Sequence, residues 1–555
     1  MNSLTTATAT SLDPNSHPTS NGVNRRSNTS EKRRDETAPQ NQEKSDNGDV
    51  DDQLRKVLRT KYRHVVAVHS ESRPSCLSHD TTESPSFLGF RNLMVIVLFV
   101  GNLRLVIENI QKYGVLICIR CHDFREHDVL LGLALYVLVP CHLLVAYVIE
   151  LLAARHARST RAMLQKRDGT SSPTVDQSKN FLAAWKIIWV AHAINITVAL
   201  AFNTYMVYYH IHHPLIGTLT EIHAVIVWLK TASYAFTNRD LRHAYLHPVK
   251  GELDAMPELY RQCPYPENIT MNNLVYFWWA PTLVYQPVYP RTDKIRWVFV
   301  MKRLGEVLGL TVFIWFTSAQ YAAPVLLNSL DKIASLDIPS IVERLLKLST
   351  ISLVIWLAGF FALFQSFLNA LAEVTRFADR SFYDEWWNSE SLGVYWRTWN
   401  KPVYQYFKRH VYSPMRSRGW SHKTASFTVF TVSAILHELL VGVPTHNLIG
   451  TFILHSTDSE VRQSNTLITG VAFLGMFFQI PLIQLTAPLE KMKSAHGKLL
   501  GNTIFWVSFT ILGQPLAALM YFYAWQAKYG SVSKSMSPGL TPDQFAACPP
   551  VPAGH

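Results

Sequence analysis

The chain has 555 residues, of which 48% are hydrophobic, and its formal net charge is +12. Its mean hydropathy is +0.06 although residues 1–85 are very polar, so the rest of the chain must be strongly apolar. These values are typical of a multi-pass membrane protein and exclude a single soluble domain. The basic residues fall mainly between apolar segments, which argues against a nucleic-acid-binding protein.

Residues 1–85 form the first predicted region. They are rich in Ser, Thr, Asn and charged residues and show almost no apolar periodicity. Such a segment cannot bury enough apolar surface to offset chain entropy, so a disordered N-terminal tail is predicted. Its basic clusters are interpreted as part of a solvated tail in preference to a lipid-binding one.

Apolar segments then recur, each of about the 20 residues that a membrane-spanning helix needs. The sequence therefore predicts an all-α polytopic membrane protein with about nine transmembrane helices. They are expected at 92–116, 129–153, 181–208, 214–235, 304–328, 346–370, 424–444, 467–486 and 499–524.

Four basic segments separate these spans, at 155–167, 239–303, 376–423 and 491–498. An alternating path places all four on the same side as the N-terminus, and the positive-inside rule assigns that side to the cytosol. The membrane domain is predicted to cover 86–527. Residues 528–555 are then a flexible luminal tail.

The sixth expected span carries a polar stripe. Gln365, Asn369 and Glu373 recur at intervals of four residues, which places them on one helix face. Two interpretations remain open, hydrogen bonding between helices or the lining of a chamber.

The seventh expected span contains His437 and Glu438 near its middle. An ionisable side chain costs about 2.5–3.5 kcal/mol at the centre of a membrane helix, so it usually faces a protein-lined cavity and has a function. The alternative is a core histidine bonded to a neighbouring helix. Ser433 precedes His437 by one helical turn and shares its face.

An aromatic and basic stretch lies between the sixth and seventh spans. Paired tryptophans can stack on a flat heterocycle, and guanidinium and ammonium groups can bind phosphates. The stretch predicts a dock for an anionic, adenine-bearing ligand, with an ordinary interfacial helix as the alternative. The basic residues concerned are Arg397, Lys401, Lys408, Arg409 and Arg416.

Several chemistries lack their motifs. No second histidine follows His437 at zinc-protease spacing, and neither a phosphate-binding Gly-x-x-x-x-Gly-Lys nor a Gly-x-Ser-x-Gly sequence is present. The pair Cys118 and Cys121 has no partner pair at zinc spacing. No metal site is predicted.

Residues 382–388, 396–414 and 433–444 resemble the membrane-bound O-acyltransferase family, in particular its diacylglycerol and sterol acyltransferase branch. His437 falls on the catalytic histidine of the family. The signature motif of the branch is matched by Phe382, Tyr383, Glu385, Trp386, Trp387 and Asn388. Glu385 stands in place of the usual Asp. Residues 102–114, 280–291, 409–414 and 513–515 are more similar to the type 1 diacylglycerol O-acyltransferases than to the sterol enzymes.

The resemblance implies helices around an intramembrane reaction chamber, in which an acyl group passes from acyl-CoA to 1,2-diacylglycerol. His437 would act as general base, with Asn400 as a second catalytic residue. The implied acyl-CoA-binding residues are Trp396, Arg397, Trp399, Asn400, Lys401, Pro402, Tyr404, Arg409, Tyr412 and Gln479. The residues expected to line the chamber or to orient His437 are Ser433, Glu438, Met476 and Gln514.

The resemblance also implies the surroundings of the protein. Acyl-CoA is a substrate, so no cofactor is expected. An endoplasmic reticulum membrane protein with a cytosolic N-terminus is expected, assembled as a homodimer or homotetramer. Two alternatives remain: a sterol O-acyltransferase, which acceptor competition would distinguish, and a membrane transporter, which solute flux would reveal.

Overall fold

A computed structural model describes residues 67–78, 85–110, 125–166, 175–246, 257–446, 471–490, 492, 494–513 and 515–523. The remainder of the predicted N-terminal tail, the predicted C-terminal tail 528–555 and Gln514 lie outside these ranges. The secondary structure of the described residues is helical. Their only β-type pairing is an isolated bridge between Arg291 and Phe377.

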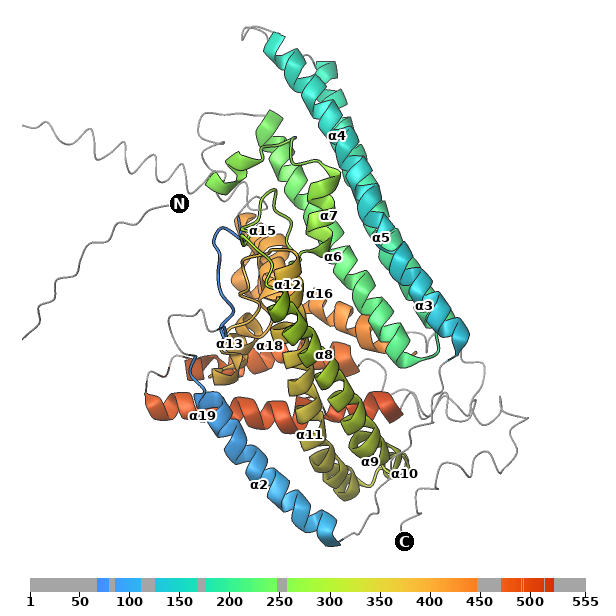
Figure 1. The fold of residues 1–555 in the computed structure, drawn as a ribbon, viewed down its shortest axis with the longest axis vertical. Helices are drawn as coiled ribbons and strands as arrows, with labels where there is room; N and C mark the ends of the chain where they lie inside the picture. Colours follow the sequence, from blue (N-terminus) through green and yellow to red (C-terminus); the bar gives the residue numbers. More distant parts are fainter. Residues whose placement is uncertain are drawn as a thin grey trace, which may run out of the picture. The chain divides into compact units, whose positions relative to one another are not determined.

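The first group of helices includes a long pair, α4 and α5, which lie side by side (Figure 1). Both pack against α6, as does α3. The bounds are α2 (Leu88–Ile110), α3 (Glu126–Leu138), α4 (Cys141–Lys166), α5 (Val175–His210) and α6 (Pro214–Leu246).

In the second group, α8 packs along α11 and along the π-helical segment and α12 that continue it (Figure 1). The bounds are 3-10 segment Glu258–Gln262, α7 (Met271–Trp279), α8 (Trp297–Thr317), π-helical Ser318–Ala322, α9 (Ala323–Leu327), α10 (Leu330–Ala334), α11 (Ile338–Phe360), π-helical Phe361–Phe367 and α12 (Leu368–Val374).

In the third group, α16 packs along α18, and α13 packs on α18. The bounds are 3-10 segment Trp386–Asn388, α13 (Leu392–Thr398), α14 (Lys401–Phe407), π-helical Lys408–Tyr412, α15 (Ser413–Ser417), α16 (His422–Gly442), α18 (Val471–Glu490), α19 (Ala495–Val507) and π-helical Ser508–Gly513.

Short polar side chains fix where several of these helices begin. Ser391, Asn400 and Ser421 each accept a hydrogen bond from the backbone N–H three residues later, at the starts of α13, α14 and α16. Each such cap satisfies one of the N–H groups that the first turn leaves without a partner.

Six of the described helices are long and apolar enough to cross a membrane, which agrees with a multi-pass membrane protein. The expected count of about nine is not confirmed. The expected spans 92–116, 304–328 and 467–486 overlap α2, α8 with the segments after it, and α18, while residues 111–116 and 467–470 lie outside the described ranges. The six spans are Glu126–Met163, Ala183–His210, Pro214–Leu246, Ile338–Val374, His422–Gly442 and Gly497–Tyr523.

Helix α6 is the innermost of the six spans. In its most apolar window 56% of the residues are buried, compared with 22–39% in the other five. Those five present large apolar side chains on their outer faces, such as Ile187 and Val137, which are more than half exposed. Side chains of this kind fit a lipid environment, in which apolar groups need no protein cover.

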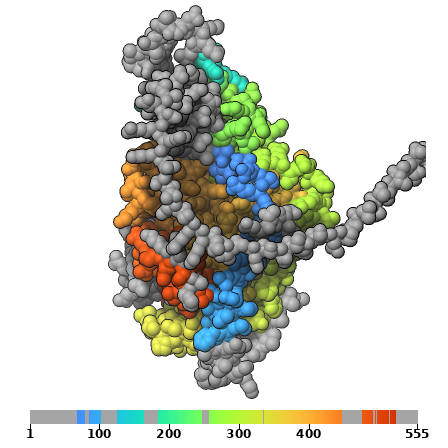
Figure 2. Space-filling model, turned by 90° about the vertical axis from the view of Figure 1, so that its left-hand side faces the viewer, coloured from blue at the N-terminus to red at the C-terminus, as the bar shows by residue number. Residues whose placement is uncertain are grey.

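Residues 67–78 differ from the expectation that the whole of 1–85 is disordered. They lie on the surface of the membrane domain, as the darker blue atoms above the lighter blue of α2 in Figure 2. His69 and Ser75 are nevertheless 7% and 2% exposed. Composition did not reveal this packing, because it rests on a few polar contacts with residues hundreds of positions away.

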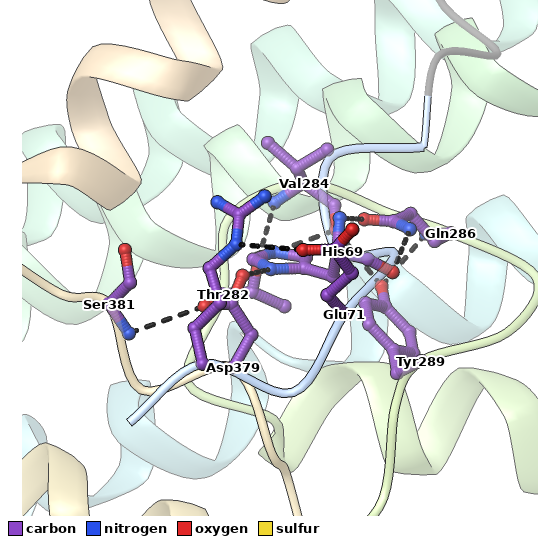
Figure 3. A network of polar contacts seen from close by, with 9 residues as sticks. His69, Glu71, Thr282, Val284, Gln286, Tyr289, Asp379 and Ser381 are labelled. Carbon is purple, nitrogen blue, oxygen red and sulfur yellow. Dashed lines mark hydrogen bonds and ion pairs between the residues drawn. The ribbon is translucent and has the colours of Figure 1, made fainter. Parts of the chain in front are cut away.

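Four contacts hold His69 in place (Figure 3). Its Nδ1 lies 2.6 Å from Asp379 Oδ2, and its Nε2 lies 2.8 Å from Thr282 Oγ1. Its backbone N–H donates to Gln286 Oε1 at 2.6 Å, and the Gln286 amide donates back to the His69 carbonyl at 3.1 Å. Because buried polar groups are costly when unpaired, this set of bonds fixes the 67–78 segment.

Candidate active site on helix α16

His437 is half-buried on α16, and its geometry determines which ring nitrogen carries the proton. Nδ1 lies 2.7 Å from the backbone carbonyl oxygen of Ser433. A carbonyl oxygen only accepts hydrogen bonds, so Nδ1 must donate. Nε2 then holds the free lone pair, and it has no hydrogen-bond partner among the described residues. The arrangement makes Nε2 the unprotonated, basic nitrogen of the ring.

Of the residues expected to orient His437, Ser433 contacts its ring and Glu438 does not. The Ser433 hydroxyl is 3.4 Å from Nδ1, so the closer contact comes from the backbone of this residue. Glu438 is 6% exposed and accepts a hydrogen bond from the Tyr521 hydroxyl at 3.1 Å. Adjacent residues on a helix point in different directions, which explains why its carboxylate is directed elsewhere. Met476 is buried on α18.

Trp396 joins three helices near this site. Its indole N–H points to Gln479 Oε1 on α18 at 3.4 Å, and its ring meets Phe430 of α16 edge to face at 6.0 Å. Phe430 precedes His437 by two turns on the same face, about 10 Å along the helix. The structure therefore brings two predicted acyl-CoA-binding residues, from α13 and α18, to the helix that carries His437.

The expected phosphate-binding cations are mostly engaged within the protein. Arg397 pairs with Glu490 at 2.6 Å, and Lys401 pairs with Asp384 at 2.8 Å. Arg409 is 5% exposed, which removes it from the surface. The sequence could not reveal the pairing of Arg397 with Glu490, because these residues lie 93 positions apart.

The remaining predicted acyl-CoA-binding residues lie in α14 or next to it in the chain. Asn400 caps this helix through Oδ1, which accepts from the Val403 N–H at 3.2 Å and leaves the amide N–H groups for other acceptors. Trp399 stacks on Tyr395, and the Lys408 ammonium lies over the Tyr404 ring at 5.7 Å. Pro402 occupies the first turn of α14, and Tyr412 meets His422 edge to face.

The signature motif is buried. Trp386 and Trp387 are both 0% exposed, and Phe382 and Tyr383 are 2% and 1% exposed. The interpretation that paired tryptophans stack on a ligand is therefore wrong for Trp386 and Trp387. Trp386 instead meets Trp356 edge to face at 5.1 Å.

The polar members of the motif hold the start of α2. Glu385 Oε1 accepts from the Ser86 N–H at 2.8 Å, and the Asn388 amide donates to the Ser86 carbonyl at 2.7 Å. Gly89 passes so close that a Cβ there would lie 1.7 Å from the Trp387 carbonyl oxygen. The motif thus fixes a helix, and Glu385 supplies the carboxylate that this contact needs.

Sequence reasoning missed Lys230 on α6, which is 4% exposed. Its Nζ donates to the carbonyl oxygens of Phe277, Trp278 and Ala280 at 2.8, 2.9 and 2.8 Å. These bonds hold the end of α7 and the start of the 280–291 stretch. A lone lysine within an apolar span was the available signal, since such a residue is rarely without a partner or function.

Comparison with known proteins identifies the family. A profile of the membrane-bound O-acyltransferase family matches residues 177–453. The chain is 33% identical to diacylglycerol O-acyltransferase 1 of Dictyostelium discoideum, over 85% of this chain and 68% of that protein. It is 34% identical to diacylglycerol O-acyltransferase 1A of Glycine max, over 84% of each, and 33% identical to diacylglycerol O-acyltransferase 1 of Arabidopsis thaliana, over 85% of this chain and 80% of that protein. The fold and these matches together show that the chain belongs to the membrane-bound O-acyltransferase family.

Proposed function

We propose that this protein transfers a fatty acyl group from acyl-CoA to the free hydroxyl of 1,2-diacylglycerol, which yields triacylglycerol and CoA. The three relatives are diacylglycerol O-acyltransferases and are matched over most of their length. They favour diacylglycerol over a sterol as the acceptor. A multi-pass membrane protein also gives both lipid substrates direct access from the bilayer.

His437 is the proposed general base, and the contact with the Ser433 carbonyl carries this part of the proposal. Nε2 takes the proton of the acceptor hydroxyl while its oxygen attacks the thioester carbonyl carbon. The carbon–sulfur bond then breaks, and the proton passes from His437 to the departing CoA thiolate. The amide groups of Asn400 and Gln479 are the proposed donors to the developing oxyanion.

The proposal places the CoA moiety on the side of the α13–α15 region, in the cytosol, because its phosphates are costly to bring into lipid. Exposed Lys408 and Arg416 remain at this surface for phosphate contacts. In this proposal the protein lies in the endoplasmic reticulum membrane with a cytosolic N-terminus, and it assembles as a homodimer or homotetramer.

The first experiment compares purified wild-type protein with His437→Ala and Ser433→Ala in lipid nanodiscs. Each receives labelled acyl-CoA with equal amounts of diacylglycerol and cholesterol. Loss of the base should lower triacylglycerol formation at least about a hundredfold. Ser433→Ala keeps the backbone carbonyl that fixes Nδ1, so its turnover should remain close to that of the wild type.

Three outcomes would change the proposal. Label in sterol ester would keep the base and replace the acceptor. Substantial turnover by His437→Ala would remove His437 from the mechanism. A loss of activity in Ser433→Ala equal to that in His437→Ala would show that the hydroxyl, and not the carbonyl, orients the ring.

A further inference from the structure

A cavity of about 500 Å³ lies apart from the His437 site. Its walls come from the 67–78 segment, from the start of α8, and from the stretch between Gln365 and Arg380. The lining residues include none from α13, α14, α16 or α18. The polar stripe of the sixth expected span, Gln365, Asn369 and Glu373, faces this cavity, so it lines a chamber of its own.

Three arginines of this cavity converge on one aromatic ring. The guanidinium carbons of Arg296, Arg303 and Arg380 lie 4.9, 5.1 and 5.5 Å from the centroid of the Phe299 ring. All four residues line the cavity. Each contact is a cation–π interaction, which attracts a cation to the ring face but does not neutralise its charge.

Two carboxylates form ion pairs with these three arginines. Glu373 accepts hydrogen bonds from Arg296 and from Arg380, and Glu306 pairs with Arg303 at 2.7 Å. Arg303 Nε is buried and has no hydrogen-bond partner among the described residues. The arginine groups thus outnumber the carboxylates that pair with them, and this positive charge suits an anion with several oxygen atoms.

Further donors stand at the rim of the cavity. Lys294 is exposed there, next to Asp293 in the chain, and Ser72 and Ser78 are among the lining residues. A phosphate group has the charge and the number of acceptor oxygens to engage arginine, lysine and hydroxyl groups together.

The position of the cavity suggests a phosphate attached to a lipid. Arg296 immediately precedes α8, whose outer face is mainly apolar in its first turns: Trp297, Val298 and Met301 are 62%, 86% and 67% exposed, and the exposed Lys302 follows them. Basic residues at the end of such a face mark the level of lipid headgroups. A soluble anion would gain nothing from this apolar face, whereas acyl chains would cover it.

The cavity wall contributed by the 67–78 segment is bonded to the remainder of the cavity. The Arg380 backbone N–H donates to the Arg73 carbonyl at 2.7 Å, and the Ser75 hydroxyl donates to Gln365 Oε1 at 3.3 Å. Asp379, next to Arg380, holds His69. A ligand of Arg380 would therefore also be next to the residues that hold this segment.

We propose that this cavity binds the phosphate of an anionic glycerophospholipid, with the acyl chains of that lipid along the exposed face of α8. Arg303 and Lys294 contact the phosphate oxygens, and Arg296 and Arg380 supply positive charge around Glu373. The site is separate from the chamber of His437, and its occupant is a bound lipid and not a substrate.

The test measures lipid retention by native mass spectrometry. The full-length protein is released from nanodiscs that contain phosphatidylcholine and phosphatidylinositol in equal amounts. Wild-type protein should retain phosphatidylinositol in preference to phosphatidylcholine. The double variant Lys294→Gln/Arg303→Gln should reduce this preference about tenfold, as expected for the loss of charge-assisted hydrogen bonds.

Lys302→Gln is the matched control. Lys302 is exposed on α8 beside Arg303, does not line the cavity, and carries the same charge. Its preference for phosphatidylinositol should equal that of the wild type. Elution as a single folded species in size-exclusion chromatography is required of each variant, with Lys294→Gln alone as the milder substitute if the double variant does not fold.

Other results would overturn the proposal. An equal loss in Lys302→Gln would indicate general surface attraction without a site. If the wild type shows no preference for phosphatidylinositol over phosphatidylcholine, the cavity is not a site for anionic lipid. Displacement of the lipid by millimolar inorganic phosphate, with equal thermal stabilisation by phosphate alone, would assign the cavity to a soluble anion. Acyl transfer is not measured, so the result is independent of the proposed activity.

Discussion

At the scale of single residues, backbone contacts decide the chemistry available to side chains. His437 shows this most directly, because a carbonyl oxygen one turn earlier fixes the proton on Nδ1 and leaves Nε2 as the basic atom. The sequence placed Ser433 on the correct face, since a spacing of four residues is local helix geometry. It could not indicate that the carbonyl lies closer than the hydroxyl.

Cys76 allows a prediction on pH. Burial raises the pKa of its thiol to about 12, so the neutral form persists well above the pH at which an exposed thiol ionises. In a variant with Cys76 as its only cysteine, the rate of alkylation should therefore rise about tenfold per pH unit from 7 to 10 without levelling off, because the thiolate is the nucleophile.

The control for Cys76 is a cysteine-free variant that carries Arg418→Cys. Arg418 is exposed at the end of α15, so its replacement should ionise near pH 8.5 and its labelling rate should level off above that pH. Equal profiles for the two variants would show that the 67–78 segment does not bury Cys76.

At the scale of elements, buried polar side chains fix segments that have no regular structure. Lys230 holds the end of α7, and His69 joins the 67–78 segment to the loop that contains Thr282 and to Asp379. Hydrophobic periodicity predicts helices and their buried faces. It contains no information on loops of this kind, whose positions depend on individual hydrogen bonds.

Lys230→Met tests this principle. The substitution keeps an unbranched side chain but leaves three carbonyl oxygens without their cationic donor, and hydrogen bonds to charged groups contribute about 1.5–3 kcal/mol each. The free energy of unfolding of the variant should be at least about 3 kcal/mol lower than that of the wild type. The loss of folded protein on heating in detergent is followed by fluorescence-detected size-exclusion chromatography.

Lys302→Met provides the comparison for Lys230→Met, since the exposed Lys302 makes no such bonds with described residues. Its stability should stay within about 0.5 kcal/mol of the wild type, as is usual for surface substitutions. Similar losses in both variants would mean that the three carbonyl contacts contribute nothing specific.

At the scale of the whole molecule, the proposed orientation in the membrane is open to a direct test. The alternating path places Arg418, before α16, in the cytosol and Ser335, between α10 and α11, in the lumen. Both residues are exposed. In sealed microsomes a membrane-impermeant maleimide should label Arg418→Cys directly and Ser335→Cys only after detergent is added. The reverse pattern would invert the orientation.

The sequence by itself determined the helical, multi-pass character of the protein and its family, and it led to the prediction that His437 is the general base. These follow from apolar length, from spacings of four residues and from contiguous motifs, all of which are local properties of a chain. Trp396 and Gln479 were each predicted to bind acyl-CoA, which stays a prediction, and the structure places them 3.4 Å apart.

Only the tertiary structure decided how distant segments combine. Trp386 and Trp387 are buried in the motif that fixes the start of α2, and Arg397 pairs with Glu490. Residues near positions 75, 300 and 370 together line the cationic cavity. The physical reason is that an ion pair or a cavity depends on which surfaces meet, and packing between residues hundreds of positions apart leaves no periodic trace in the sequence.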